Sequence, residues 1–311
     1  MKRLVGALAV AGVLATPQAW ALNILLSNDD GYQHANIRAL YSALTAAGHT
    51  VAIAAPQSDQ SARGGAFYFG REVHIGQDTD PAFPHSYYVS TQESGLCESA
   101  GCSGKTVAIE ISGTPVMAVL MGLKKVMPHP DLVIVGPNPG NNVGAINAAS
   151  GTFNAASVAV QAGIPSLAVS TDLKEQDPQR AAQLVTRLVA TLDRHRQPDG
   201  RLLPAATGLN VNLPAANPAK GMRLTRIGQY TGFEATWTDD LAKLFPQQAG
   251  KPGISFQYSA PASPAQQNDE AVWLAKGYVT VSAFNGAPAS IVVGSALGNQ
   301  LRPALLSQQA Q

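Results

Sequence analysis

Short apolar runs alternate with segments of helical pattern along the first two thirds of the chain. The apolar runs have the length of buried strands, and they lie at residues 23–27, 50–54, 106–111, 131–135 and 166–170. Helices are expected at residues 35–47, 115–126, 152–162 and 180–194. Strands that alternate with helices in this way predict an α/β fold with a doubly wound, mainly parallel sheet. Such folds bind ligands at the carboxyl ends of their strands.

The pattern changes after about Pro214. Apolar alternation returns at residues 222–227 and 278–283, but residues 230–264 are rich in Gly, Pro and Gln and have no helical period. We expect a smaller, largely β appendage in this part of the chain, with a hairpin that reaches a partner subunit. The expected division is a core at residues 22–215 and a C-terminal hairpin and oligomerisation region at residues 216–311 that completes the same domain.

The first 21 residues have the pattern of a secretory signal peptide. Lys2 and Arg3 precede an apolar run at residues 4–15, and Ala19-Trp20-Ala21 provides the small residues of a signal peptidase site. A membrane anchor is the alternative, but this run is short because a helix that spans a bilayer needs about 20 apolar residues. We expect cleavage after Ala21 and a periplasmic or secreted protein.

Composition and charge exclude two classes of protein. Charged residues make up 13% of the chain, and the 21 Lys and Arg nearly balance the 20 Asp and Glu. No strongly basic stretch is present that could bind a nucleic-acid duplex by neutralising its phosphates. The 45% share of hydrophobic residues argues equally against a disordered chain.

Export changes the interpretation of the two cysteines. Cys97 and Cys102 stand close together in a stretch rich in Gly and Ser, and an oxidising compartment favours a disulfide between them. A bridge that closes so short a loop would stabilise the fold by only about 2 kcal/mol, so its effect would be local. Two free thiols are the alternative.

Two acidic residues follow the first apolar run. In ILLSNDDG at residues 24–31, Asp29 and Asp30 stand at the end of the expected strand, and Gly31 permits a turn there. Neighbouring carboxylates repel each other, and a bound cation relieves that repulsion. The alternative is an Asx turn that caps the next helix without a ligand.

Two further loops also follow expected strands. VGPNPGNNVG at residues 135–144 leaves backbone and side-chain amides free to contact a phosphate group, and Ser150-Gly151-Thr152 stands where a helix begins and attracts anions. PQSDQSARGG at residues 56–65 carries hydroxyl groups and Arg63, which are candidates to bind a cation or phosphate. A flexible linker and an ordinary surface turn are the alternatives for these two loops.

Taken in order, these motifs resemble the SurE survival-protein family of metal-dependent phosphatases and nucleotidases. The resemblance covers nearly all of the chain expected after cleavage, through ILLSNDDG, AAPQSDQS, GTP at 113–115, PDLVIVGPNPGNNVG at 130–144, SGT at 150–152, GIPSLAVS at 163–170, LNVNLP at 209–214 and GYVTV at 277–281. It implies a Rossmann-like fold whose C-terminal hairpin exchanges between subunits, in a homodimer or homotetramer.

The resemblance also implies which residues form the site. One divalent cation would be bound by Asp29, Asp30, Ser61 and Asn138. The phosphate group would be contacted by Asn142, Ser150, Gly151 and Thr152, with Asn28 as a further candidate in the first loop. A ligand set made only of oxygen atoms suits Mg²⁺ or Mn²⁺ better than zinc.

Three positions depart from the family pattern. Met117 stands where relatives usually carry Asp, and Val158 replaces a common Glu in the helix after SGT. Asn36 stands where Gly is usual, which is a mild change because Asn also tolerates turn geometry. The loss of two acidic groups bears on the support of the site or on the choice of substrate.

We therefore expect an exported, metal-dependent phosphomonoester hydrolase that acts on nucleoside monophosphates, with Asp29 and Asp30 as catalytic residues. Two nucleophiles stay open: a water activated by the metal, which we favour and for which Asp29 is base or orienting group, and Asp29 itself. The alternative from another class is a periplasmic α/β solute-binding protein without turnover. Such a binder needs two similar lobes, whereas here one strand and helix series precedes a dissimilar tail.

Overall fold

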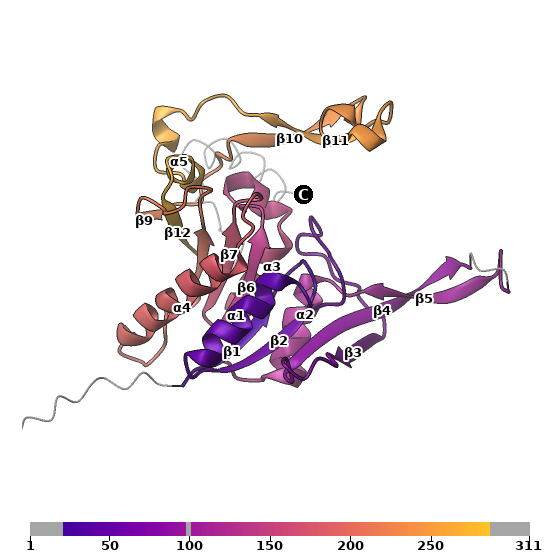
Figure 1. Ribbon diagram of the computed structural model, residues 1–311, viewed down its shortest axis with the longest axis horizontal. Coiled ribbons are helices and arrows are strands. Elements are labelled where there is room, and N and C mark those ends of the chain that lie inside the picture. The colour runs from indigo at the N-terminus through magenta and orange to yellow at the C-terminus, as the bar shows by residue number, and fades with distance from the viewer. Residues whose placement is uncertain (1–20, 98–100, 287–311) are drawn as a thin grey trace, which may run out of the picture.

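The computed structural model describes residues 21–97 and 101–286 (Figure 1). The signal peptide expected at residues 1–21 lies almost wholly outside them. The described helices include none long and apolar enough to cross a membrane.

Ten strands form the main sheet, in the order β3-β4-β2-β1-β6-β7-β8-β12-β9, with β5 paired to β4. Their bounds are β1 Asn23–Ser27, β2 Thr50–Pro56, β3 Val73–Gln77, β4 Ser86–Leu96, β5 Thr106–Ser112, β6 Leu132–Pro139, β7 Ser166–Thr171, β8 Gly208–Asn212, β9 Met222–Thr225 and β12 Val279–Phe284. The pairs along the centre, from β4 through β2, β1, β6 and β7 to β8, are all parallel. The predicted α/β fold with a doubly wound, mainly parallel sheet is confirmed.

Helices cover both faces of this sheet. The longer ones are α1 Ala35–Ala46, α2 Pro115–Met121, α3 Gly151–Gln161, α4 Pro178–Arg194 and α5 Glu270–Ala275. Short helical turns lie at Gly122–Val126, Gly144–Ala148, Leu241–Lys243, Pro246–Gln248 and Pro264–Gln266. Each expected helix is present, with ends that differ by a few residues.

Side-chain alternation in the central strands divides the core into two layers. Ile24 and Leu26 of β1 pack in one apolar cluster with α1 and α4, whereas Leu25 packs in a second cluster with α2 and α3. Successive strand residues point to opposite faces, so a strand that is apolar throughout must be covered on both sides. This explains why β1 and its neighbours are continuous apolar runs.

The segment at 106–111 is a strand, as expected, but it is not part of the parallel series. It is β5, which pairs antiparallel with the long strand β4 and forms an arm that extends away from the sheet (Figure 1). Most of β5 is exposed, so its apolar residues are not buried between helices as those of a central strand are. The strands β3 and β4 were not expected from the sequence.

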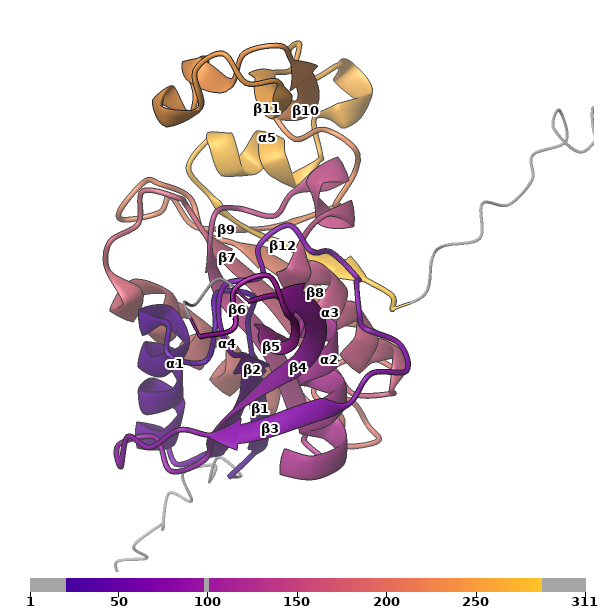
Figure 2. The same ribbon diagram turned by 90° about the vertical axis from the view of Figure 1, so that its right-hand side faces the viewer.

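The C-terminal part also differs in detail from the expected appendage. The expected strands at 222–227 and 278–283 are β9 and β12, and both belong to the main sheet. The hairpin lies instead in the Gly-, Pro- and Gln-rich stretch, where β10 (Phe233–Thr238) pairs antiparallel with β11 (Gly253–Tyr258) as a separate sheet. Figure 2 shows this pair stacked beyond α5 at one end of the main sheet.

Candidate functional site

Three loops that follow neighbouring strands meet at one edge of the sheet. β1 lies between β2 and β6 and is parallel to both, so the carboxyl ends of the three strands point the same way. Asp29 and Asp30 follow β1, Ser61 lies in the loop after β2, and Asn138 stands near the end of β6. The fold thus brings the loops of the four expected metal ligands to the same edge.

Asp29 is buried against the beginning of α3. Its Oδ1 accepts a hydrogen bond of 2.8 Å from the hydroxyl of Thr152, in the first turn of that helix. A Cβ atom built on Gly151 would lie 2.9 Å from both Cβ and Oδ2 of Asp29. Because that distance is shorter than a normal contact, the close approach of Asp29 to α3 requires glycine at position 151. The helix dipole also favours a negative charge at this end.

Asp30 has an oxygen, Oδ2, that is buried without a hydrogen-bond partner among the described residues. The imidazole of His34, whose Nδ1 lies 4.0 Å from this oxygen, has a pKa that burial lowers, so it does not supply a full positive charge. Burial is the main cause that raises the pKa of Asp30 to about 8, and the negative charges of Asp29 and Asp59 contribute less. Burial also raises the pKa of Asp29, although its hydrogen bond from Thr152 partly offsets the rise. Two adjacent carboxyl groups that resist ionisation form a site that lacks a compensating positive charge.

The loop after β2 is fixed to the same place. The amide of Gln60 donates to the backbone oxygen of Asp29 over 2.7 Å. The next residue, Ser61, is exposed, and both its amide and its hydroxyl donate to Oδ1 of Asp59, over 2.8 and 2.7 Å. Ala62 then adopts a positive φ of 62°, which is unusual for a residue with a side chain. Asp59 therefore orients Ser61 and adds negative charge to the site.

A bulge near the end of β6 sets the position of Asn138. The pairing of β6 with β7 shifts between Val135 and Asn138, so that Asn138 lies opposite Ser170. Gly136 makes this bulge with a φ of 111°, and a Cβ there would lie 2.2 Å from the backbone oxygen of Val169. The Nδ2 of Asn138 donates to Gly140 over 2.6 Å, which leaves Oδ1 as the atom that can bind a cation.

Asn142 lies farther along the sheet edge, over the ends of β7 and β8. Its Nδ2 donates to the hydroxyl of Ser170 over 2.9 Å, and its backbone amide donates to Oδ1 of Asn212 over 3.0 Å. Its backbone oxygen accepts bonds of 2.9 Å from the side chains of Asn210 and Asn212. This network of amides holds the Gly- and Asn-rich loop in one shape.

Glu270 anchors the same network from the C-terminal part of the chain. This side chain is fully buried, and Oε1 accepts hydrogen bonds from the amide of Gly144 and from the side chains of Asn147 and Asn210. Burial raises the pKa of Glu270 to about 7 in spite of these bonds. The sequence analysis did not identify Glu270, because nothing near it in the chain shows that it is buried. The sequence also did not single out Asp59 as a residue of the site, although it lies in the PQSDQSARGG segment at residues 56–65.

Asn28 and Ser150, like Asn142 and Thr152 described above, have hydrogen-bond partners within the loop structure. Both polar atoms of the Asn28 side chain bond to the backbone of Gly31, over 2.9 and 3.2 Å, and so close the turn that carries the two aspartates. The hydroxyl of Ser150 accepts from the amide of Phe153 over 3.0 Å and caps α3. Their contact with phosphate stays a prediction, as does that of Asn142, Gly151 and Thr152.

The donors at this sheet edge fit a hard divalent cation. The buried, unpaired Oδ2 of Asp30 and the raised pKa of both carboxyl groups indicate a place where positive charge is missing. Oxygen atoms of Asp29, Asp30, Ser61 and Asn138 are the groups that could hold the ion. In the part of the chain that the structure describes, no cluster of three or more His, Cys, Asp or Glu is arranged for a metal, so any ion here depends on neutral oxygen ligands as well.

The departures from the family pattern lie in ordinary packing environments. Met117 is buried in the apolar cluster under α2, and its sulfur accepts from the amide of Tyr68. Val158 packs against the same cluster from α3. The Nδ2 of Asn36 donates to the backbone oxygen of Pro137 over 3.0 Å and so ties the start of α1 to the bulge of β6.

The two cysteines lie far from this site, at the tip of the β4–β5 arm. The structure joins Cys97 and Cys102 by a disulfide, with their Cα atoms 5.6 Å apart. Backbone bonds from Cys97 to Lys105 and from Gly104 to Cys97 continue the ladder of the hairpin into this turn.

Comparison with known proteins agrees with the fold and with the resemblance to the SurE family. A family model described as survival protein SurE matches residues 24–233. The chain is 32% identical to the 5'-nucleotidase SurE of Desulforudis audaxviator over 236 residues, which cover 74% of this chain and 81% of that protein. It is 33% identical to 5'-nucleotidase SurE 1 of Thermus thermophilus over 266 residues, which cover 84% of this chain and 90% of that protein.

A solved structure extends the similarity to three dimensions. The crystal structure of the SurE protein from Aquifex aeolicus superposes with a TM-score of 0.66 at 26% identity, and the match covers 89% of this chain and 98% of that one. Because the family model spans well over half of the sequence and the relatives match over most of their length, this chain belongs to the SurE survival-protein family.

Proposed function

We propose that this protein is a phosphomonoester hydrolase that depends on a divalent cation, Mg²⁺ or Mn²⁺, and releases phosphate from nucleoside monophosphates. The relatives named above are 5'-nucleotidases, which supports the class of reaction. The observation that carries the proposal is the pair Asp29 and Asp30, buried side by side against the first turn of α3 with one carboxylate oxygen unpaired.

The residues of the chain have distinct parts in this proposal. A bound divalent cation would supply the positive charge that offsets the negative charge of the phosphoryl group. Asn142 and the first turn of α3, from Ser150 to Thr152, hold the phosphoryl oxygens, because the dipole of α3 favours an anion at this end of the helix and Nδ2 of Asn142 keeps a second hydrogen to donate. Thr152 fixes Asp29, which either accepts a proton from an attacking water or attacks phosphorus itself. Hydrolysis in heavy-oxygen water separates these routes by the label on phosphate or on an enzyme carboxylate.

The test is phosphate release from a panel of nucleoside 5'- and 3'-monophosphates, with Mn²⁺, with Mg²⁺ and with a chelator. We expect turnover that the chelator abolishes and that Asp29→Asn removes together with the rise in melting temperature caused by Mn²⁺. Asp199→Asn is the matched control, because Asp199 is exposed and pairs with Arg201 away from the site. Binding of nucleotides without turnover in any of these conditions would favour the periplasmic solute-binding protein instead.

We also propose that the protein is exported. The signal-peptide pattern of residues 1–21 supports this, and the disulfide between Cys97 and Cys102 suits an oxidising compartment. Mass spectrometry of protein from the periplasm or medium tests the proposal, since cleavage after Ala21 makes Leu22 the first residue. Full-length protein in the cytoplasm would contradict it.

The β10–β11 hairpin supports a homodimer or homotetramer. The cross-strand pairs Trp237–Ile254, Ala235–Phe256 and Phe233–Tyr258 place their side chains on one face, and most of these residues are more exposed than apolar side chains usually are. A second copy of the chain would cover this face. Light scattering after size exclusion should give a multiple of the chain mass, and Trp237→Glu should lower it. A monomer at micromolar concentration would contradict this assembly.

A further inference from the structure

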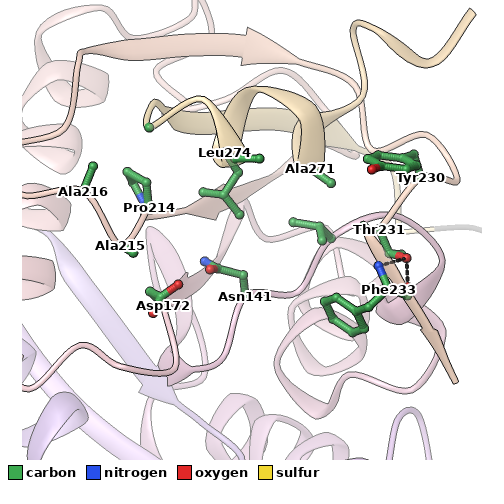
Figure 3. Close-up of a pocket in the computed structure, with 14 residues that line it drawn as sticks. Asn141, Asp172, Pro214, Ala215, Ala216, Tyr230, Thr231, Phe233, Ala271 and Leu274 are labelled. Atoms are coloured by element: carbon green, nitrogen blue, oxygen red, sulfur yellow. Dashed lines mark hydrogen bonds between the residues drawn. The ribbon is translucent and has the colours of Figure 1, made fainter. Parts of the chain in front are cut away.

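A cavity of about 300 Å³ lies next to the candidate site, beyond the ends of β6, β7 and β8 (Figure 3). Figure 3 shows Asn141 and Asp172 on one side of it, Leu274 of α5 on the opposite side, and the segment from Tyr230 to Phe233 closing a third side. None of the residues assigned to the metal or to phosphate lines it. Its volume is at the lower end of the range for small-molecule sites.

The cavity is lined in part by the expected phosphate-binding loop, through Asn141 and Val143. Thr171, just before Asp172, donates its hydroxyl to the backbone oxygen of Asn138 over 3.2 Å, and its own backbone oxygen accepts from Gly140 over 3.0 Å. Asn141 lines the cavity, and Asn142 is the next residue in the chain. A substrate whose phosphate contacts Asn142 would therefore have this cavity beside it, since both neighbours of Asn142 in the chain, Asn141 and Val143, line the cavity.

The walls exclude phosphate and favour a neutral group with rings. Among the described residues that line the cavity, Asp172 has the one charged side chain, and no Lys or Arg lines it. A carboxylate repels a phosphate group, so the anionic end of a substrate cannot be the part that enters. The remaining walls are mostly apolar or aromatic, with Tyr230, Phe233 and Leu274 as their largest members.

Asn141 and Asp172 each leave one acceptor atom free in the cavity. Asn141 uses its Nδ2 to donate to the backbone oxygen of Leu213 over 3.0 Å, which leaves Oδ1 for a ligand. Asp172 accepts from the amide of Lys174 with Oδ1 over 2.9 Å, which leaves Oδ2. Two acceptors beside apolar walls suit a group that offers hydroxyl donors and a flat ring, as a nucleoside does.

We propose that this cavity binds the nucleoside part of a nucleoside monophosphate, with the sugar hydroxyls donating to Asp172 and Asn141 and the base packed against Phe233 and Leu274. The inference rests on the proposed function, because it assumes that phosphate occupies the neighbouring loop. To the proposed function, the inference adds the residues that select the nucleoside, which is the leaving group of the reaction. Asp172 acts by binding the sugar and has no part in the chemistry at phosphorus.

The test compares the kcat/KM values of three esters: adenosine 5'-monophosphate, its 2',3'-dideoxy analogue and 4-nitrophenyl phosphate. The wild-type kcat/KM should be about tenfold or more higher for the nucleotide with both hydroxyls than for its dideoxy analogue. The reason is that the loss of one hydrogen bond to a charged group weakens binding by about that factor. Asp172→Ala should reduce this preference to less than about threefold, mainly through KM for the hydroxylated nucleotide. Asp199→Ala, which removes an exposed carboxylate outside the cavity, should keep the wild-type preference.

Binding of adenosine, which has no phosphate, provides a second readout by calorimetry. Asp172→Ala and Phe233→Leu should each weaken it about tenfold or more, whereas Asp199→Ala should not. If phosphate is released from these esters but the hydroxyl preference is absent, or is unchanged in Asp172→Ala, the nucleoside cavity is wrong and the proposed function stands. If none of the esters is hydrolysed with either metal, the proposed function itself fails.

Discussion

Gly144 and Glu270, which are 126 positions apart, are joined by a hydrogen bond of 3.0 Å from the glycine amide to Oε1 of the buried glutamate. The same carboxylate accepts from the side chains of Asn147 and Asn210. These partners are donors, and an ionised carboxylate offers only acceptors. The shape of the loop that carries Asn142 therefore depends on a residue of α5, far along the chain.

Replacement of Glu270 should loosen that loop. Glu270→Ala leaves the buried donors of Gly144, Asn147 and Asn210 without this acceptor, so we expect a loss of about 1 to 3 kcal/mol in the free energy of unfolding, measured with urea. Glu270→Gln should also destabilise the fold, because its NH₂ group would face the donors of Asn210. KM for nucleoside monophosphates should rise in both. Glu72→Gln, at an exposed position, is the control, and equal behaviour of the three proteins would contradict the anchoring role.

The same glutamate should make stability depend on pH. Its pKa is raised to about 7 in the folded chain from 4.5, chiefly by burial. A carboxyl group that binds its proton more tightly when folded favours folding most below pH 4.5, and this contribution is lost as the pH rises through 7. The difference corresponds to about 3 kcal/mol. Urea unfolding of the metal-free protein at pH 5 and pH 8 measures this contribution. The free energy of unfolding should fall more between pH 5 and pH 8 for the wild type than for Glu270→Gln.

Gly151→Ala should disable the site with little change in the fold around it. The added Cβ would lie 2.9 Å from both Cβ and Oδ2 of Asp29 and from Cγ of Pro115, and neither Cβ of Asp29 nor the proline ring can move away by a simple side-chain rotation. Asp29 would have to move, and a displacement of about 1 Å at a catalytic group can cost about 100-fold in rate. Phosphate release should fall by about that factor. Gly101→Ala, where a Cβ meets nothing within 4 Å, is the control and should keep full activity.

The centre of the fold could be predicted from the sequence, whereas its outer parts could not. Ile24, Leu25 and Leu26 are buried on both faces of the sheet, so β1 is apolar throughout and its loop contains the conspicuous pair of aspartates. In β5 the same kind of apolar pattern comes from a mostly exposed arm, and periodicity alone does not reveal the antiparallel partner β4. The hairpin β10–β11 shows neither a long apolar run nor a short turn signal.

The candidate site divides in the same way. Asp29, Asp30 and Asn138 follow strands that the sequence predicts, so their common edge could be expected. Glu270 could not, because a charged residue at the start of a short helix is usually exposed, and its burial depends on Asn210 and Gly144 from distant strands and loops. Local pattern identifies residues that follow strands, but it does not identify residues whose role comes from contacts distant in sequence.

The disulfide should matter for the arm and not for the reaction. Cys97→Ser combined with Cys102→Ser opens a short loop, which lowers stability by about 2 kcal/mol at most on the chain-entropy model. The bridge closes the tip of the β4–β5 arm, which extends outward from the main sheet (Figure 1). Phosphate release by the double variant should stay within twofold of the wild type, and proteolysis at the arm should be faster. A large loss of activity would show that the arm contributes to the site of another subunit.

Metal binding should compete with protons at the paired aspartates. The pKa of Asp30 is raised to about 8, first by burial and then by the charges of Asp29 and Asp59, so the metal-free site holds a proton at neutral pH. A cation replaces that proton, and its affinity should rise as the pH increases from 6 to 8. The increase in melting temperature caused by Mn²⁺ should therefore be several degrees larger at pH 8 than at pH 6. Asp30→Asn has no proton to lose there, so it should bind Mn²⁺ weakly and with little pH dependence. A wild-type protein whose Mn²⁺-induced shift is the same at both pH values would place the ion elsewhere.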